Sequence, residues 1–194
     1  MNVRIGLAQH RIGPDMEENL RQAQRAVLAC AGQGAQLVLL PEMFCCLYQL
    51  ERLRACAQPR GGEIWRQLRA LACQAGVYLL GGSMPELDAQ GRIYNTSFFF
   101  SPAGEELACY RKCHLFDVSL PGGLCIQESS VFTPGEQLRV VESPFGKIGL
   151  AICFDLRFPE QFRALADRGA QLVLVPAAFN STTGPAHWEI NCRS

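Results

Sequence analysis

The sequence lacks a net charge, long apolar runs and a recognisable targeting segment. Lys and Arg together number 18, as do Asp and Glu, so no long-range field attracts nucleic acid or an anionic membrane. No apolar stretch approaches the roughly 18 residues that a membrane span needs. The first residues have neither a basic region nor an apolar core of signal-peptide length. We therefore expect a soluble cytoplasmic protein whose partners are small or neutral molecules.

Paired metal ligands are also lacking, although the sequence contains ten cysteines. Zinc sites usually repeat a Cys-x-x-Cys spacing, whereas Cys45 and Cys46 are adjacent and Cys109 and Cys113 lie four positions apart. A chain of 194 residues, 48% of them hydrophobic, can bury a sizeable core without disulfides. We predict one globular domain over residues 1–194 with reduced thiols, no metal and no cofactor. A thiol-rich redox or metal-binding module is disfavoured.

The sequence does contain a near repeat. Residues 34–41 read GAQLVLLP, and residues 169–176 read GAQLVLVP. Each copy is preceded by the apolar segment IGLA, at residues 5–8 and 148–151. A helical pattern lies between IGLA and each copy, at residues 17–32 and 159–168. Apolar strands joined by amphipathic helices are typical of parallel strand–helix–strand units, so we predict an α/β fold with two such units. The alternative is chance similarity, because strand composition is degenerate.

Two polar residues follow apolar strands of these units. Glu42 comes directly after Pro41, and Cys153 comes directly after Ile152. In open α/β sheets, functional residues gather beyond the carboxyl ends of the strands. We therefore predict that Glu42 and Cys153 lie on the same rim of the sheet.

Between the repeats the pattern becomes antiparallel, which predicts a mixed sheet. We expect a strand near residues 77–81 and a hairpin over residues 93–110. Lys112 follows the second arm of this hairpin and is therefore also placed at a strand end. A long loop with Gly and Pro is expected over residues 114–134, and it contains Glu128. Loops of this length in compact domains are usually functional.

Cys153, Glu42 and Lys112 have side chains that suit cysteine-based amide hydrolysis. A single cysteine is more often an inert core residue, but Cys153 lies between a strand and a helix expected after Phe158-Pro159, where N–H groups and the helix dipole favour a thiolate. Alone, Glu42 and Lys112 are ordinary solvated charges. Beside a thiol, the carboxylate can act as general base and then acid, and the ammonium can stabilise an oxyanion. None of the three histidines lies in a context that demands the role of base.

Three ordered motifs resemble the glutamate, lysine and cysteine signatures of the nitrilase superfamily of carbon–nitrogen hydrolases. They are PEMF at residues 41–44, YRKCHLFD at residues 110–117 and CFDLRFPE at residues 153–160. The tripeptide QES at residues 127–129 is similar to the segment of the second glutamate that orders the site. The resemblance runs over residues 3–189 and implies a nitrilase-type α-β-β-α sandwich with mixed sheets. It implies four catalytic residues, namely Glu42, Lys112, Glu128 and Cys153.

Within the superfamily, residues 114–118, 127–129 and 183–188 look most like the omega-amidase branch. This resemblance implies hydrolysis of the terminal amide of 2-oxoglutaramate or 2-oxosuccinamate through a thioester, with release of ammonia. A neighbouring branch that acts on deaminated glutathione shares much of the same core. Arg157 offers a planar fork for a substrate carboxylate, and Tyr48 and Thr183 offer hydroxyls. In the alternative interpretation, Arg157 forms a structural ion pair.

The chain is shorter than the domain of the family that it resembles. It ends inside an expected helix, so we expect the C-terminal part of the fold to be missing, with an exposed sheet edge and an incompletely covered core. For a full-length relative the resemblance implies a homodimer. The rival interpretation is a catalytically silent form that acts only through a partner. The complete set of catalytic residues favours the enzyme.

Overall fold

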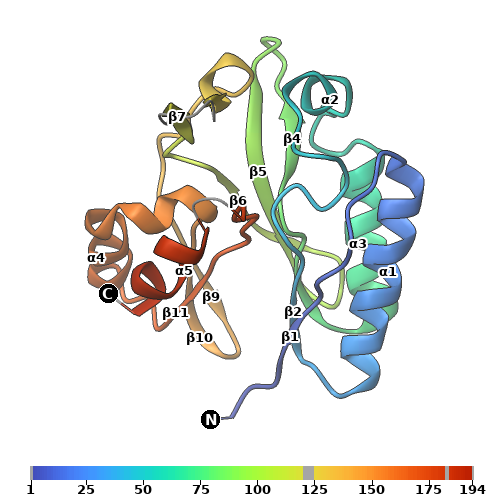
Figure 1. Cartoon of the computed structure of the whole chain (residues 1–194). Helices are drawn as coiled ribbons and strands as arrows, with labels where there is room; N and C mark the ends of the chain where they lie inside the picture. Colours follow the sequence, from blue (N-terminus) through green and yellow to red (C-terminus); the bar gives the residue numbers. More distant parts are fainter. Residues whose placement is uncertain (1, 120–124, 182–183, 194) are drawn as a thin grey trace.

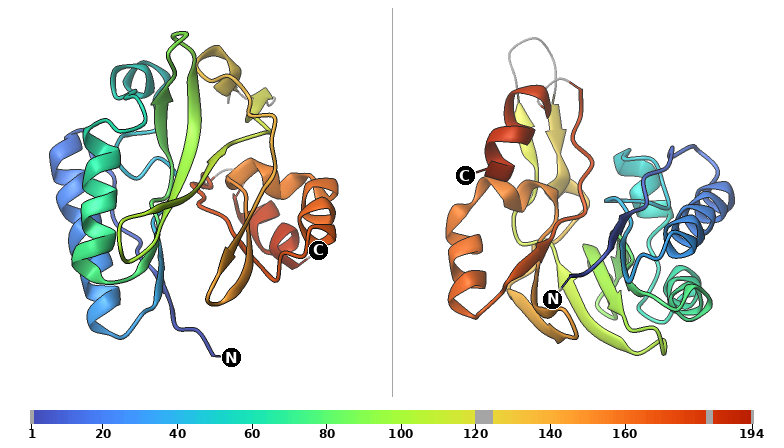
Figure 2. Two further views of the ribbon diagram at one scale, coloured as in Figure 1. Left: turned by 180° about the vertical axis from the view of Figure 1, so that it is seen from behind. Right: turned by 90° about the horizontal axis from the view of Figure 1, so that it is seen from below.

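The computed structural model describes residues 2–119, 125–181 and 184–193. Two β-sheets pack face to face, and helices cover the outer face of each sheet (Figure 1). Views from behind and from below show the same order of layers (Figure 2). This arrangement confirms the predicted α-β-β-α sandwich with mixed sheets.

The first sheet has the strand order β1-β2-β3-β5-β4, and β6 also pairs with β5. Its strands are β1 (Ile5–Leu7), β2 (Leu37–Leu39), β3 (Tyr78–Leu80), β4 (Met84–Leu87), β5 (Ile93–Phe100) and β6 (Glu106–Arg111). The helices of this half are α1 (Met16–Gly32), α2 (Leu50–Ala55) and α3 (Glu63–Ala75). Strand β3 pairs in parallel with β2 and antiparallel with β5. The predicted mixed sheet is therefore confirmed, and the pairing changes from parallel to antiparallel at this strand.

The second sheet has the strand order β11-β10-β9. Its elements are β9 (Arg139–Ser143), β10 (Gly146–Leu150), the 3₁₀ helix η2 (Cys153–Arg157), α4 (Pro159–Asp167), β11 (Leu172–Leu174) and α5 (Gly184–Arg193). Helix α4 starts with Pro159 at its first position, where the missing N–H of proline costs no hydrogen bond. Helices α4 and α5 cover the outer face of this sheet (Figure 1).

The near repeat corresponds to two parallel strand–helix–strand units, as predicted. Strands β1 and β2 pair in parallel with Ile5 opposite Leu37, and β10 and β11 pair in parallel with Ile148 opposite Leu172. The two units belong to different sheets, however, and not to one. A local sequence pattern specifies a unit but does not specify which sheet the unit joins, so the prediction of a single shared rim was wrong in this respect.

The core between the two sheets is apolar and closely packed. Its fully buried side chains include Leu37, Leu80, Phe99, Ile148 and Leu150. This burial holds the two strand–helix–strand units together, since removing a buried phenylalanine or leucine side chain costs about 2–5 kcal/mol.

The face that β1 presents to this core is only partly covered. Ile5 and Leu7 pair with Leu37 and Leu39, so their side chains lie on the same face of the sheet. Leu37 is fully buried, whereas Leu7 is 73% exposed. Strand β1, at the edge of its sheet, therefore exposes apolar side chains.

The segment predicted as a continuous loop over residues 114–134 contains short regular elements. Strands β7 (Asp117–Ser119) and β8 (Cys125–Gln127) form an antiparallel pair, and the 3₁₀ helix η1 (Glu128–Ser130) follows. The predicted long loop therefore includes short elements that the sequence did not indicate, because three-residue strands leave almost no periodic signal. In the described part of the chain, no helix is both long and apolar enough to cross a membrane.

Candidate active site

The four predicted catalytic residues come together at the ends of strands from both sheets. Glu42 follows β2, Lys112 follows β6, Glu128 begins η1 and Cys153 begins η2. Glu42, Lys112 and Cys153 line a cavity of about 170 Å³. The remaining wall of this cavity is largely apolar and includes Phe116, Ile126, Phe154 and Phe179.

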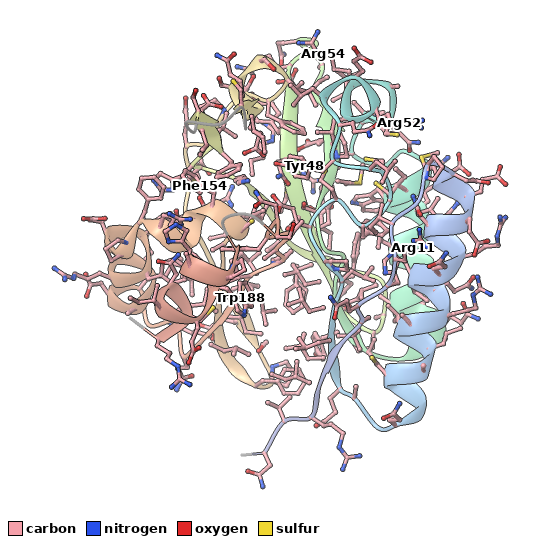
Figure 3. The ribbon with its side chains drawn as sticks, viewed as in Figure 1. Arg11, Tyr48, Arg52, Arg54, Phe154 and Trp188 are labelled. Carbon is pink, nitrogen blue, oxygen red and sulfur yellow. The ribbon has the colours of Figure 1, made fainter. Side chains whose placement is uncertain are left out.

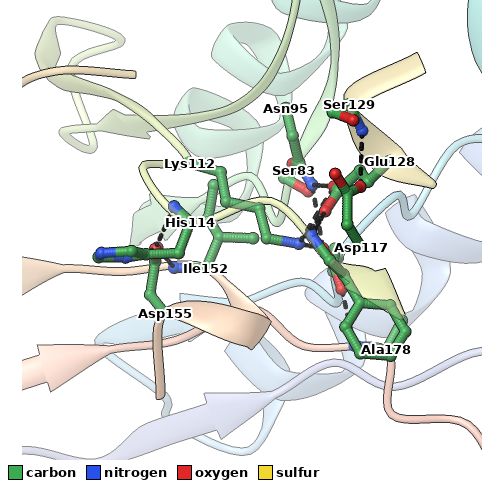
Figure 4. A network of polar contacts seen from close by, with 12 residues as sticks. Ser83, Asn95, Lys112, His114, Asp117, Glu128, Ser129, Ile152, Asp155 and Ala178 are labelled. Carbon is green, nitrogen blue, oxygen red and sulfur yellow. Dashed lines mark hydrogen bonds and ion pairs between the residues drawn. The ribbon is translucent and has the colours of Figure 1, made fainter. Parts of the chain in front are cut away.

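Lys112 lies between two carboxylates and is only 1% exposed. Its Nζ atom lies 3.0 Å from Glu42 Oε1 and 2.9 Å from Glu128 Oε2. Burial alone would lower the pKa of this ammonium, but the two carboxylates outweigh that effect and raise the pKa. Lys112 is therefore a fixed positive charge beside the cavity and not a proton donor. Figure 4 shows Lys112 directed toward Glu128.

Glu128 is fully buried, and its two oxygens are occupied by donors. The Tyr48 hydroxyl donates to Oε1 over 2.6 Å, Asn95 Nδ2 donates to Oε1 over 3.2 Å, and the Phe116 N–H donates to Oε2. With Lys112 also bound, this carboxylate is saturated with hydrogen bonds. It is suited to hold Lys112 in place and not to accept a proton from a substrate.

Glu42 is 2% exposed and contacts three donors of different kinds. Oε1 accepts from Lys112 Nζ and, over 2.9 Å, from Asn95 Nδ2, while Oε2 accepts from the Ala178 N–H over 3.1 Å. The next residue, Met43, has a φ of 50°, and its N–H donates to Ser83 Oγ over 3.1 Å. This left-handed turn directs the Glu42 carboxylate from β2 into the space between the sheets.

Cys153 lies in a strained turn and faces Glu42. Its φ is 43°, and its N–H donates to the Pro176 carbonyl over 2.9 Å, which ties the turn to the end of β11. Burial and the Glu42 carboxylate raise the pKa of the Cys153 thiol, against the opposing effects of Lys112 and of the Ala178 N–H. Burial and Glu42 thus outweigh the N–H groups that were expected to favour a thiolate. The Cys153 side chain is a thiol beside a carboxylate.

A second buried network ties this turn to the strand that carries Lys112. Asp155 is fully buried, and its carboxylate accepts from the Ile152 N–H over 2.8 Å and from the Tyr110 hydroxyl over 2.7 Å. The same carboxylate accepts from the His114 N–H over 3.0 Å, and His114 Nδ1 lies 2.8 Å away. Figure 4 shows Asp155 between His114 and Ile152. Asp155 therefore fixes the turn of Cys153 relative to Lys112.

The three predicted substrate-binding residues differ in where the structure places them. Arg157 lines the cavity, with Cζ 5.7 Å from the centre of the Phe154 ring. Its Nε is buried without a hydrogen-bond partner, and among the described residues Arg157 forms no ion pair, so the structural ion pair considered above is absent there. Tyr48 also lines the cavity, but its hydroxyl is bound to Glu128. Figure 3 shows the positions of Tyr48 and Phe154. Thr183 lies outside the described residues.

Sequence reasoning missed Asn95, Asp155 and the Ala178 N–H. Asn95 lies in β5, where it is 1% exposed. A polar residue at a buried strand position needs a hydrogen-bond partner, and this was the signal available for it. The only sequence feature that pointed to Asp155 was its place in the cysteine motif. No sequence feature pointed to the Ala178 N–H. Among the described residues, no group of three His, Cys, Asp or Glu side chains is arranged to hold a metal ion.

Comparison with protein families gives one match that covers nearly the whole chain. The family model for carbon–nitrogen hydrolase matches residues 4–194. Among curated proteins, the omega-amidase NIT2 of Xenopus tropicalis is 42% identical over 187 residues, which are 96% of this chain and 67% of the relative. The omega-amidase NIT2 of Homo sapiens is 42% identical over 191 residues, which are 98% of this chain and 69% of the relative. The chain thus spans about two thirds of these relatives.

Solved structures of similar proteins share the fold. Nit3 of Saccharomyces cerevisiae, a member of branch 10 of the nitrilase superfamily, aligns with a TM-score of 0.87 at 33% identity, over 98% of this chain and 70% of that protein. A mutant amidase from Nesterenkonia sp. AN1, with acrylamide added at its active-site cysteine, aligns with a TM-score of 0.80 at 32% identity. That alignment covers 95% of this chain and 70% of the amidase.

Proposed function

The chain belongs to the carbon–nitrogen hydrolase family, and from this premise we propose that it hydrolyses a small linear amide through a Cys153 thioester. The observation that carries the proposal is the meeting of a protonated thiol, a buried carboxylate and a fixed ammonium at one small cavity. Glu42 is the general base, Lys112 stabilises the oxyanion, and Glu128 holds Lys112.

The proposed reaction has two halves. As the Cys153 sulfur attacks the amide carbon, its proton passes to Glu42, and the developing oxyanion is held by Lys112 and a backbone N–H. Glu42 then protonates the departing nitrogen, so ammonia leaves and a thioester remains. In the second half, water attacks the thioester while Glu42 takes a proton from it. The carboxylic acid is released, and the proton returns to the Cys153 sulfur.

The raised pKa of the Cys153 thiol fits this sequence of steps. A thiol that stays protonated at neutral pH needs a base in contact with it when it attacks. Glu42 is in that position, and no histidine takes the role in the described site. The Lys112 charge would then be used twice, since it stabilises the oxyanion in both halves of the reaction.

For the substrate we propose the terminal amide of 2-oxoglutaramate or 2-oxosuccinamate. The similarity to proteins named omega-amidase supports this choice. So does Arg157, because a guanidinium with a buried, unpartnered Nε at the wall of the cavity is available for a substrate carboxylate. The volume of about 170 Å³ suits a small amide better than a peptide.

The test is ammonia release from 2-oxoglutaramate by the purified chain, with Cys153→Ala as the blank. We expect release that depends on Cys153 and a thioester detectable by mass spectrometry of the acid-quenched protein. A soluble, folded preparation in which wild type and Cys153→Ala release equal amounts would contradict the proposed nucleophile. Silence from wild type would instead support the catalytically silent form.

A second experiment tests the role of Arg157. Arg157→Met should lower kcat/KM for 2-oxoglutaramate by roughly 10–100-fold, because a charge-assisted hydrogen bond contributes about 1.5–3 kcal/mol. A neutral amide such as butyramide is the matched control, and its turnover should change far less. Equal losses for the two substrates would show that Arg157 supports the fold of the site and does not bind the carboxylate.

A further inference from the structure

A second cavity lies on the first sheet, apart from the candidate active site. It has a volume of about 370 Å³, and four arginines from four separate segments line it, namely Arg60, Arg92, Arg111 and Arg139. Tyr94 lies among them, with Arg111 Cζ 3.7 Å and Arg92 Cζ 5.6 Å from the centre of its ring. Four guanidinium groups at one cavity repel one another and need a compensating arrangement.

Buried carboxylates provide that compensation for three of the arginines. Arg60 pairs with Glu106, Arg92 with Asp88, and Arg111 with Glu86, at 2.7–2.8 Å. The three carboxylate side chains are 9%, 7% and 5% exposed, whereas the guanidinium side chains are 61%, 53% and 32% exposed. The acids therefore face inward and the cations face solvent. A ligand that enters the cavity meets oriented N–H donors and only one exposed carboxylate on its lining, that of Glu136.

The donors are held in place before any ligand arrives. Arg111 makes a two-point contact with Glu86, and Thr96 also donates to Glu86 over 2.7 Å. Arg139 Nε donates to the Cys109 carbonyl over 3.2 Å, which leaves its terminal nitrogens available. Since long side chains lose rotamer entropy on binding, donors fixed by other contacts bind an anion at lower cost.

This cavity and the active site lie on opposite faces of the same two strands. Side chains alternate along a strand, so Tyr94 and Arg111 belong to the cavity, while Asn95 and Lys112, one residue later, belong to the active site. Gly135, on the cavity wall, donates its N–H to the Lys112 carbonyl over 2.8 Å. A ligand in the cavity would thus contact residues that precede Asn95 and Lys112 in the chain, and Gly135, which is hydrogen-bonded to Lys112.

We propose that this cavity is a binding site for a small phosphate-bearing anion. A tetrahedral group with several oxygens can accept hydrogen bonds from guanidinium forks that arrive from different directions, which a single carboxylate cannot do. The lining is polar and charged, which disfavours an apolar ligand. The proposal does not depend on the proposed amidase activity.

The experiment is isothermal titration calorimetry with inorganic pyrophosphate, at an ionic strength kept constant with sodium chloride. We expect saturable binding by wild type. Arg92→Gln/Arg139→Gln should weaken it by about tenfold or more, since two charged donors are removed. Arg21→Gln/Arg25→Gln is the matched control, because it removes two arginines of helix α1, outside the cavity, and should bind as wild type does. Arg111 is left unchanged because its removal would leave Glu86 buried without its cation, whereas Asp88 keeps two backbone N–H donors when Arg92 is replaced.

Three outcomes would overturn the proposal. They are the absence of saturable heat with wild type, equal affinity in wild type and in the folded double variant, and loss of binding in Arg157→Gln, which would place the anion in the active site. Circular dichroism establishes that each variant is folded. If the double variant does not fold, Arg139→Gln alone is expected to weaken binding, and unchanged affinity there would also contradict the site.

Discussion

Two buried polar networks flank Cys153, and they are built differently. The first joins Lys112 to Glu42 and Glu128, so it contains a cation between two carboxylates. The second centres on Asp155, whose donors are a tyrosine hydroxyl, two backbone N–H groups and the His114 ring. The first network sets the charge around the thiol, and the second sets the position of its turn. Variants that affect one function and spare the other test this division.

Removal of Lys112 should have the largest effect. Lys112→Met leaves two carboxylates facing each other without their cation, which should cost about 3–5 kcal/mol of the free energy of unfolding. Loss of the oxyanion donor should lower kcat by about 10²–10³-fold. Urea unfolding and amide turnover measure the two effects. The control is Lys147→Met, since the exposed pair of Lys147 with Glu142 contributes little. A stable, active Lys112→Met would contradict the role of the charge network.

Loss of the Asp155 charge should have an intermediate effect. Asp155→Asn weakens the bonds from the Ile152 N–H, Tyr110 and His114, at a cost of about 2–3 kcal/mol. Displacement of the Cys153 turn should lower kcat, by up to about 100-fold for a shift near 1 Å, while the pH profile of kcat keeps its shape. A shifted pH profile would show that Asp155 also acts through charge. Asp167→Asn, at an exposed position on α4, is the control.

The reactivity of the thiol should respond to the charge of Lys112. Because burial and Glu42 raise the pKa of Cys153 and Lys112 opposes them, Lys112→Met should slow alkylation of Cys153 by iodoacetamide at a fixed pH. Mass spectrometry of the Cys153 peptide measures the rate, with exposed Cys73 as the internal reference. Alkylation of Lys112→Met at or above the wild-type rate would contradict this role of Lys112.

The smallest expected effect is on stability at high pH. The folded state holds the Cys153 proton more tightly than the unfolded state does, so its contribution is fully present below the ordinary thiol pKa of 9.0 and is lost as the pH rises above it. The free energy of unfolding of wild type should therefore fall relative to Cys153→Ser above about pH 9. Parallel unfolding curves for the two proteins up to pH 10.5 would contradict the raised pKa.

The sequence predicted local units and motif residues well, and long-range partnerships poorly. The near repeat predicted two parallel units, and ordered motifs pointed to Glu42, Lys112 and Cys153. Asn95 was missed because its hydrogen bond to Glu42 joins residues 53 positions apart, and no local pattern encodes such a pair. The effect of burial on the pKa of Cys153 was missed for a similar reason. Its burial depends on two sheets that meet only in the folded protein.

The backbone of Met43 and Cys153 has a consequence for the order of folding. Both residues adopt positive φ, which costs a non-glycine residue of order 1–3 kcal/mol and persists only when its surroundings enforce it. Those surroundings include the opposite sheet, since Glu42 accepts from the Ala178 N–H after β11, and Asp155, in the turn of Cys153, accepts from the Tyr110 hydroxyl of β6. During refolding each strand–helix–strand unit can form by itself, whereas the turn of Cys153 and the turn after Glu42 must wait until the two sheets meet. Helical circular dichroism should therefore return before amide turnover, and the interval between them would measure how late the catalytic geometry is acquired.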